Sequence, residues 1–181
     1  MAKSLLKTPF IFIMLLSTIS QVIGQENYPI PKETPTRLFY IQHSNNFNTY
    51  VYDANIVNGS IVKESPIKEY RIVYTEGGEI KPLTGLQKRM AYGLTTSYIS
   101  PNFYEMYLAV NKKTPFYLTL NSNLEPKVYI TVNNRKMYIS NIFVKLKDSF
   151  SLIYVEADYI IFKGTDFNTQ KKVTEKYIMP N

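Results

Sequence analysis

Short runs in which apolar and polar residues alternate cover most of the chain after residue 38. Alternation over four to eight residues is typical of a strand with one buried face. In the run from residue 67 to 75, Tyr70 and Tyr74 lie on one face and Arg71 lies on the other. The runs predict strands over residues 38–42, 49–57, 67–75, 94–100, 103–110, 116–121, 127–132, 137–146, 152–162 and 171–178.

Turn residues separate these runs, and one segment has a helical pattern. Pairs typical of tight turns stand between runs at Asn58-Gly59, Gly77-Gly78, Asn133-Asn134 and Lys147-Asp148. From Leu83 to Gly93 the chain holds good helix formers, with Thr84 suited to the N-cap and Gly93 suited to stop the helix. We therefore predict a mainly β fold, a single-domain antiparallel β-barrel or sandwich with one short helix.

Residues 1–24 have the regions of a secretory signal peptide. Two lysines precede an apolar run from Phe10 to Leu16, and Val22 and Gly24 suit a cleavage site before Gln25. The alternative, a transmembrane anchor, needs about 20 predominantly apolar residues, and the unbroken run has only seven. Cleavage would leave no segment long and apolar enough to span a membrane.

The residues after the predicted cleavage site form a proline-rich linker. Between Gln25 and Arg37 stand Pro29, Pro31 and Pro35 and few apolar residues, so we expect this segment to be extended and mobile. The single β-rich domain then spans residues 38–180.

Composition narrows the classes of function. The chain has no Cys and one His, which argues against a disulfide scaffold, a cysteine nucleophile and a thiolate or His metal site. No cofactor-binding motif is present. The net charge of +7 becomes +5 without the two lysines of the signal (19 basic against 14 acidic residues), and the basic residues are scattered, so nucleic acid is not an expected partner. An exported chain without Cys fits a bacterial envelope, and we expect a periplasmic or extracellular location.

Two carboxylates are candidates for hydrolytic chemistry. In the predicted strand 152–162, Glu156 and Asp158 share a face with apolar residues. Two like charges this close raise one of the two pKa values and attract a metal, so the pair suits glycoside hydrolysis or a site for a hard cation. The alternative is that the opposite face is buried and both acids face water, as alternation commonly indicates.

The tyrosines and His43 have two interpretations each. Tyrosines in strands line sugar or lipid pockets, or they fill the core of a sheet. His43 ends the first predicted strand beside Ser44, and we interpret it as a turn residue rather than a triad base, because no nucleophile-elbow motif is present.

Several segments resemble a bacterial family catalogued as a domain of unknown function, DUF4833. They are the opening Leu38 to Gln42 and Asn48 to Asn55, the middle segments Tyr70 to Tyr74 and Leu86 to Gly93, and the close from Tyr154 to Pro180. His43 stands where the family pattern has a basic residue, commonly Arg. The resemblance implies an exported single-domain protein of Bacteroidota-type bacteria and carries no activity, catalytic residue or cofactor.

Three functions from different classes follow. The first is binding of a small apolar or amphipathic ligand in an aromatic-lined β cavity, with the lining or gating residues Tyr52, Tyr70, Arg71, Tyr74, Gln87 and Arg89. The second is a structural or adaptor role, in which an exposed sheet edge pairs with another envelope protein. The third is a carbohydrate-active hydrolase that uses Glu156 and Asp158. We lean toward a non-enzymatic protein.

Overall fold

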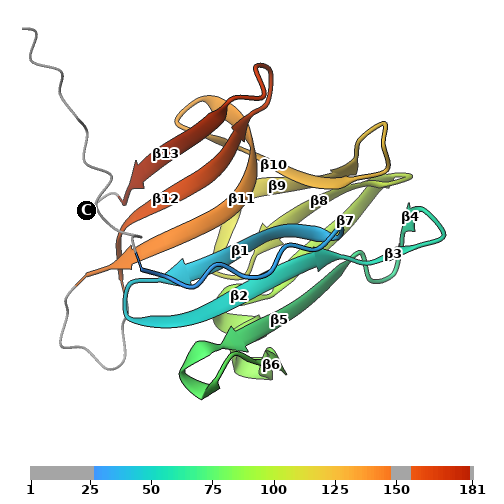
Figure 1. Ribbon diagram of the computed structural model, residues 1–181. Helices are drawn as coiled ribbons and strands as arrows, with labels where there is room; N and C mark the ends of the chain where they lie inside the picture. Colours follow the sequence, from blue (N-terminus) through green and yellow to red (C-terminus); the bar gives the residue numbers. More distant parts are fainter. Residues whose placement is uncertain (1–26, 148–155, 180–181) are drawn as a thin grey trace, which may run out of the picture.

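The computed structural model describes residues 27–147 and 156–179. Within these ranges the fold is mainly β, with one eleven-stranded sheet and one two-stranded sheet (Figure 1). The strands are β1 (Arg37–His43), β2 (Asn46–Ala54), β3 (Ile56–Val57), β4 (Ser60–Ile61), β5 (Ile67–Val73), β6 (Glu79–Pro82), β7 (Leu94–Ser100), β8 (Phe103–Leu108), β9 (Asn111–Leu120), β10 (Pro126–Val132), β11 (Arg135–Leu146), β12 (Ala157–Asp166) and β13 (Lys172–Ile178).

The sheet divides at β11. The first part of β11 pairs antiparallel with β10, from Arg135 to Tyr138, and the later part pairs in parallel with β1, from Asn141 to Val144. The other edge of β11 pairs with β12 from Met137 to Leu146, and β12 pairs with β13. Two arms therefore leave β11, one in the order β1-β2-β5-β6 and the other in the order β10-β9-β8-β7.

A bulge at the division of the sheet depends on a glycine. The register between β11 and β12 shifts between Ile139 and Asn141, where the strand passes from one arm to the other. Gly164 of β12 lies opposite, and a Cβ atom there would come within 1.8 Å of the Tyr138 carbonyl oxygen. Only glycine allows the two backbones to approach this closely.

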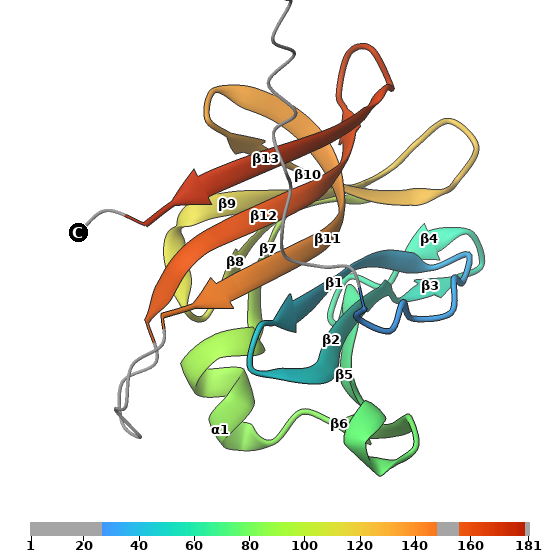
Figure 2. The same ribbon diagram turned by 60° about the vertical axis from the view of Figure 1, so that its left-hand side comes forward.

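The two arms curl toward one another into a half-barrel and enclose the core (Figure 2). Phe39 of β1 stacks on Tyr52 of β2 and on Phe116 of β9, with ring centroids 4.5 and 5.7 Å apart. Several side chains of the arm β10-β9-β8-β7 and of β11 are fully buried: Tyr104, Met106, Leu118, Val128, Ile130 and Met137. Aromatic, aliphatic and methionine side chains thus fill the space between the arms.

A short helix joins β6 to β7 at one end of the half-barrel (Figure 2). It consists of α1 (Gly85–Gln87) continued by the π-helical turn η2 (Lys88–Tyr92). Thr84 is its N-cap in a capping box with Gln87, as the sequence predicts. The helix ends at Gly93 as expected, although for a different reason: Gly93 is extended, and a Cβ there would lie 2.4 Å from the Lys88 carbonyl oxygen.

The structure refines several sequence-based boundaries. The predicted strand 67–75 ends at Val73, because Tyr74–Glu76 form the 3₁₀ turn η1 closed by Gly77 in the left-handed conformation. The predicted strand 49–57 divides into β2 and β3, and β4 and β6 were not predicted. The one parallel pair among the described strands, β1 with β11, also departs from the fully antiparallel expectation, because alternation does not report strand order.

The proline-rich segment does not extend freely from the domain over its described residues. The Tyr28 ring packs edge-on against Phe47 and Phe143, with centroids 5.2 and 5.1 Å away. The Pro29 carbonyl accepts a hydrogen bond of 2.7 Å from the Gln42 side chain, and Pro31 is buried. An aromatic ring and a carbonyl thus attach residues 28 and 29 to β1, β2 and β11. The linker as a whole stays a prediction.

Candidate functional site

The residues predicted to line one cavity lie on opposite faces of the sheet. Arg71 is paired with Tyr50, whose ring faces the core between the arms, and Tyr52 faces the same way. Tyr70 is paired with Val51 and packs with Tyr74 on the outer face. One cavity cannot contain both groups, because side chains of adjacent strand residues point to opposite faces.

Tyr52 is part of the core. The side chain is fully buried, and its hydroxyl donates a hydrogen bond of 2.7 Å to the Tyr92 carbonyl oxygen. Burial raises the pKa of this phenol well above its ordinary value. Tyr52 therefore fixes the exit of the helix against β2.

Tyr70 belongs to a buried polar network on the outer face. Its hydroxyl donates to the Asp53 carboxylate over 2.9 Å and accepts from the Arg37 guanidinium over 3.1 Å. Arg37 and Asp53 form an ion pair of 2.6 Å, and their side chains are 6% and 13% exposed. Desolvation and the hydrogen bond to Asp53 raise the pKa of Tyr70. These contacts attach the start of β1 to β2 and β5.

The two predicted helix residues have different roles. The Gln87 side chain accepts a hydrogen bond of 3.0 Å from the Thr84 backbone amide, so it completes the helix cap. Arg89 is exposed and lines the groove described below.

His43 packs in an aromatic cluster under the helix. Its Nε2 atom lies 3.0 Å from the Tyr92 hydroxyl, and Tyr92 stacks on Tyr50 with centroids 3.5 Å apart. Desolvation lowers the pKa of the imidazole to about 4, so His43 is neutral at neutral pH. Its contacts are those of a packing residue that joins the end of β1 to the helix.

The two candidate acids lie at the solvent-exposed start of β12. Glu156 precedes the strand and forms an ion pair of 3.0 Å with Lys147, and Asp158 is exposed within the strand. Neither residue lines the groove. The first part of the predicted strand, residues 152–155, lies outside the described residues. The hydrolase hypothesis stays a prediction.

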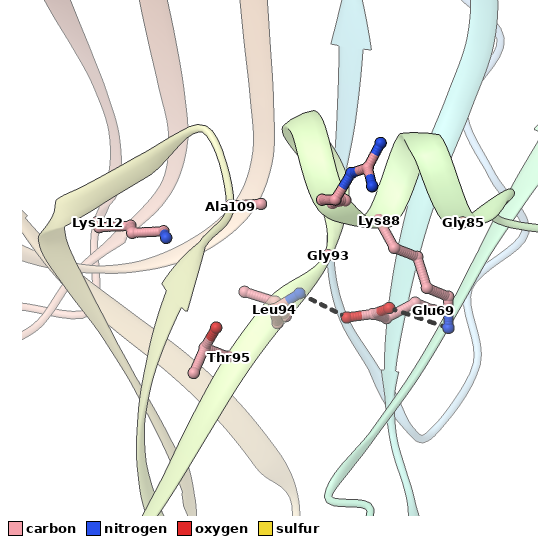
Figure 3. A pocket seen from close by; sticks show the side chains of 9 residues that line it. Glu69, Gly85, Lys88, Gly93, Leu94, Thr95, Ala109 and Lys112 are labelled. Atoms are coloured by element: carbon pink, nitrogen blue, oxygen red, sulfur yellow. Dashed lines mark hydrogen bonds and ion pairs between the residues drawn. The ribbon is translucent and has the colours of Figure 1, made fainter.

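A groove lies beside the helix, between β5, the start of β7 and the turn from β8 to β9 (Figure 3). Its volume is about 450 Å³. Three cationic side chains line it, Lys88, Arg89 and Lys112, against one carboxylate, Glu69. Glu69 accepts a hydrogen bond of 2.7 Å from the Leu94 amide and lies 3.5 Å from the Lys88 ammonium. The lining therefore has a net charge of +2 (three cations minus one anion).

The strand that begins in this groove has an open edge. β7 pairs with β8 and, among the described residues, with no strand on its other side. Every residue from Thr95 to Ser100 is exposed, including Tyr98 and Ile99 at 45% and 50%. None of the seven residues of β7 is charged, glycine or proline.

The backbone groups on the open edge can be assigned from the ladder. The Ala109 amide donates to the Gly93 carbonyl, and Leu94 is paired with Leu108. Because hydrogen-bonded and non-hydrogen-bonded pairs alternate in an antiparallel ladder, the backbone groups of Leu94, Thr96 and Tyr98 point away from β8. The Leu94 amide already donates a hydrogen bond to Glu69, so the outward amides available to a partner strand are those of Thr96 and Tyr98.

No group of three or more His, Asp or Glu side chains suited to a metal ion occurs among residues 27–147 and 156–179. Within the same residues no helix has the length and apolar character needed to cross a membrane.

The sequence did not predict the groove. Of the residues that line it, only Arg89 was among the predicted binding residues. Glu69 is not singled out in the sequence, and Lys88 and Lys112 are counted among its scattered basic residues. The segment Leu94 to Ser100 contains more polar than apolar residues, and this was the available signal for a strand exposed on both faces.

Fold and site define a mainly β protein whose curled sheet leaves an open strand edge beside a cationic groove. The model of the family described as a domain of unknown function, DUF4833, matches residues 39–176. The chain belongs to this family, as the resemblance of its segments indicated. No curated protein and no solved structure matches it.

Proposed function

We propose that this is an exported envelope protein that binds another protein by accepting an extended segment of it along the open edge of β7. The observation that carries the proposal is a seven-residue edge strand that is exposed on both faces and has no charged residue. An unpaired row of backbone amides and carbonyls is a template for an additional strand.

The other sheet edges that have no neighbour among residues 27–147 and 156–179 have features that discourage pairing. β6 is four residues long and contains Glu79, Lys81 and Pro82. β13 contains Lys172, Glu175 and Lys176. Short length, charge and proline are the usual protections of an edge against another strand. Their absence from β7 favours this edge as the binding surface.

The ligand-binding hypothesis has less support than the adaptor hypothesis. Its aromatic residues Tyr52, Tyr70 and Tyr74 lie on two faces, and Tyr52 is completely buried among core side chains. A small ligand in an aromatic-lined cavity would need that space.

Site-specific photocrosslinking in the producing cells tests the proposal. The full-length protein carries p-benzoylphenylalanine in place of Tyr98 on β7 or, as the matched control, of Tyr177 on β13. These tyrosines are 45% and 41% exposed. We expect an adduct with a different polypeptide from Tyr98 and none from Tyr177, and the cross-link should map to one extended segment of the partner.

A proline substitution distinguishes strand addition from other contacts. Because the Thr96 amide points to the open edge, Thr96→Pro removes a donor for the partner and keeps the pairing with β8. Thr96→Val is the control that keeps the amide. The adduct should disappear with proline and remain with valine, while circular dichroism shows both variants folded. An adduct that resists folded Thr96→Pro, that forms equally from Tyr177, or that joins only two copies of this chain would overturn the proposal.

A further inference from the structure

We infer that the groove at the start of β7 selects its partner by charge: it binds a carboxylate at the C-terminal end of a strand that adds antiparallel to β7. This inference rests on the proposed function and specifies the chemistry of the partner segment.

The groove and the open edge form one continuous surface. Leu94 and Thr95, the first residues of β7, line the groove together with Lys88 and Lys112 (Figure 3). Arg89 also lines it. A segment that follows the edge toward Leu94 therefore enters a lining of net charge +2. Carboxylates form strong hydrogen bonds with guanidinium and ammonium groups.

Strand polarity decides which end of the partner reaches the groove. Antiparallel pairing is slightly more stable per residue than parallel pairing, and it is the arrangement of β7 with β8. A segment antiparallel to β7 runs from Ser100 toward Leu94, so its C-terminal end arrives at the groove.

Glu69 marks the point where the added strand leaves the edge. Its carboxylate accepts the Leu94 amide hydrogen bond, so a partner carbonyl finds free amides at Thr96 and Tyr98 and none at Leu94. The next residues of the partner must turn away from the sheet. In the groove they meet Arg89 and Lys112, whereas Lys88 lies 3.5 Å from Glu69.

The other end of β7 has a different charge environment. There Lys63 lies over the Tyr98 ring, 4.5 Å from its centroid. This cation already contacts a ring, whereas the lining of the groove has a net charge of +2. The surface therefore fits a segment whose middle is uncharged and whose C-terminal end is acidic.

Three fluorescein-labelled peptides test the inference in an anisotropy titration with the full-length protein. Each contains seven alternating threonine and valine residues and a C-terminal amide. The first ends in two glutamates, the second ends in two glutamines, and the third carries the two glutamates at its N-terminal end. We expect the first peptide to bind about five- to tenfold more tightly than the other two at low salt. Added salt should remove this preference.

Paired lysine variants locate the charge effect. Lys112 lines the groove, whereas Lys113, the next residue, does not. Lys112→Gln should reduce the preference for the first peptide at least threefold, and Lys113→Gln should leave it unchanged. Equal effects of the two variants would overturn the inference.

The outcomes separate the two proposals. If all three peptides bind equally and folded Thr96→Pro abolishes binding, strand addition stands and charge selection fails. If the peptide with N-terminal glutamates binds best, the assigned polarity is wrong. If Thr96→Pro leaves the binding of every peptide unchanged, or if no peptide binds the wild-type protein, both proposals fail.

Discussion

Burial determines the charge of His43. The imidazole packs against Tyr50 and Tyr92, and desolvation lowers its pKa from 6.5 to about 4. The folded state therefore prefers neutral His43, while the unfolded chain takes up a proton below pH 6.5.

The sign of this linkage gives a pH prediction. The stabilisation by neutral His43 is complete above pH 6.5 and is lost as pH falls from 6.5 toward 4, by a total on the order of 3 kcal/mol. Urea unfolding of the wild-type protein and of His43→Gln between pH 8 and pH 4 measures this loss of stabilisation. The difference between their free energies of unfolding should shrink over this window, because the variant has no imidazole to protonate. A difference that is constant with pH would contradict the assignment.

The predicted ligand-binding residues lie on two faces of the sheet, and the reason is visible in single residues. The alternation in the run 67–75 correctly placed Tyr70 and Arg71 on opposite faces. The sequence could not show which face encloses space, because this depends on the second arm of the sheet. Three of the predicted residues have structural roles through hydrogen bonds. Tyr52 holds the end of the helix, Tyr70 holds the start of β1, and Gln87 completes the helix cap.

At the scale of elements, the division of β11 between two arms depends on the bulge opposite Gly164. A methyl group at this position would collide with the Tyr138 carbonyl oxygen, which is backbone and cannot rotate away. Gly164→Ala should lower the free energy of unfolding by about 1–3 kcal/mol, the usual cost of overpacking.

A second glycine is the control for this prediction. A Cβ atom on Gly85, in the first turn of α1, would meet no atom within 4 Å. Gly85→Ala should leave stability unchanged or raise it, because alanine favours the helix. Thermal and urea unfolding compare both variants with the wild-type protein. Equal stability of the two variants would disprove the close approach at Gly164.

At the scale of the whole molecule, the proposed function requires that the protein is exported. The sequence predicts cleavage after Gly24, with Val22 and Gly24 at the positions where small residues are favoured. Intact-mass measurement of the protein from the envelope fraction should find a chain that begins at Gln25. Gly24→Leu should leave the uncleaved precursor. A full-length wild-type chain in the cytosol would contradict export.

The sequence by itself determined the strand-rich character, most turns, the capped helix and the family. These are local properties, because alternation, left-handed Asn-Gly pairs and the capping box act between residues close in the chain. Asn133 and Asn134, for example, both have the positive φ that the turn requires. The signal peptide stays a prediction from the same kind of local pattern.

Only the tertiary structure decided the arrangement of those elements. The parallel pairing of β1 with β11 joins Tyr40 to Asn141 across a hundred residues of chain, and no local pattern specifies it. The same pairing sets the two arms against one another. It places Glu69 and the helix beside the start of β7, and it leaves the uncharged edge of that strand without a described neighbour. Strand order depends on contacts between distant residues, and the groove and the open edge follow from that order.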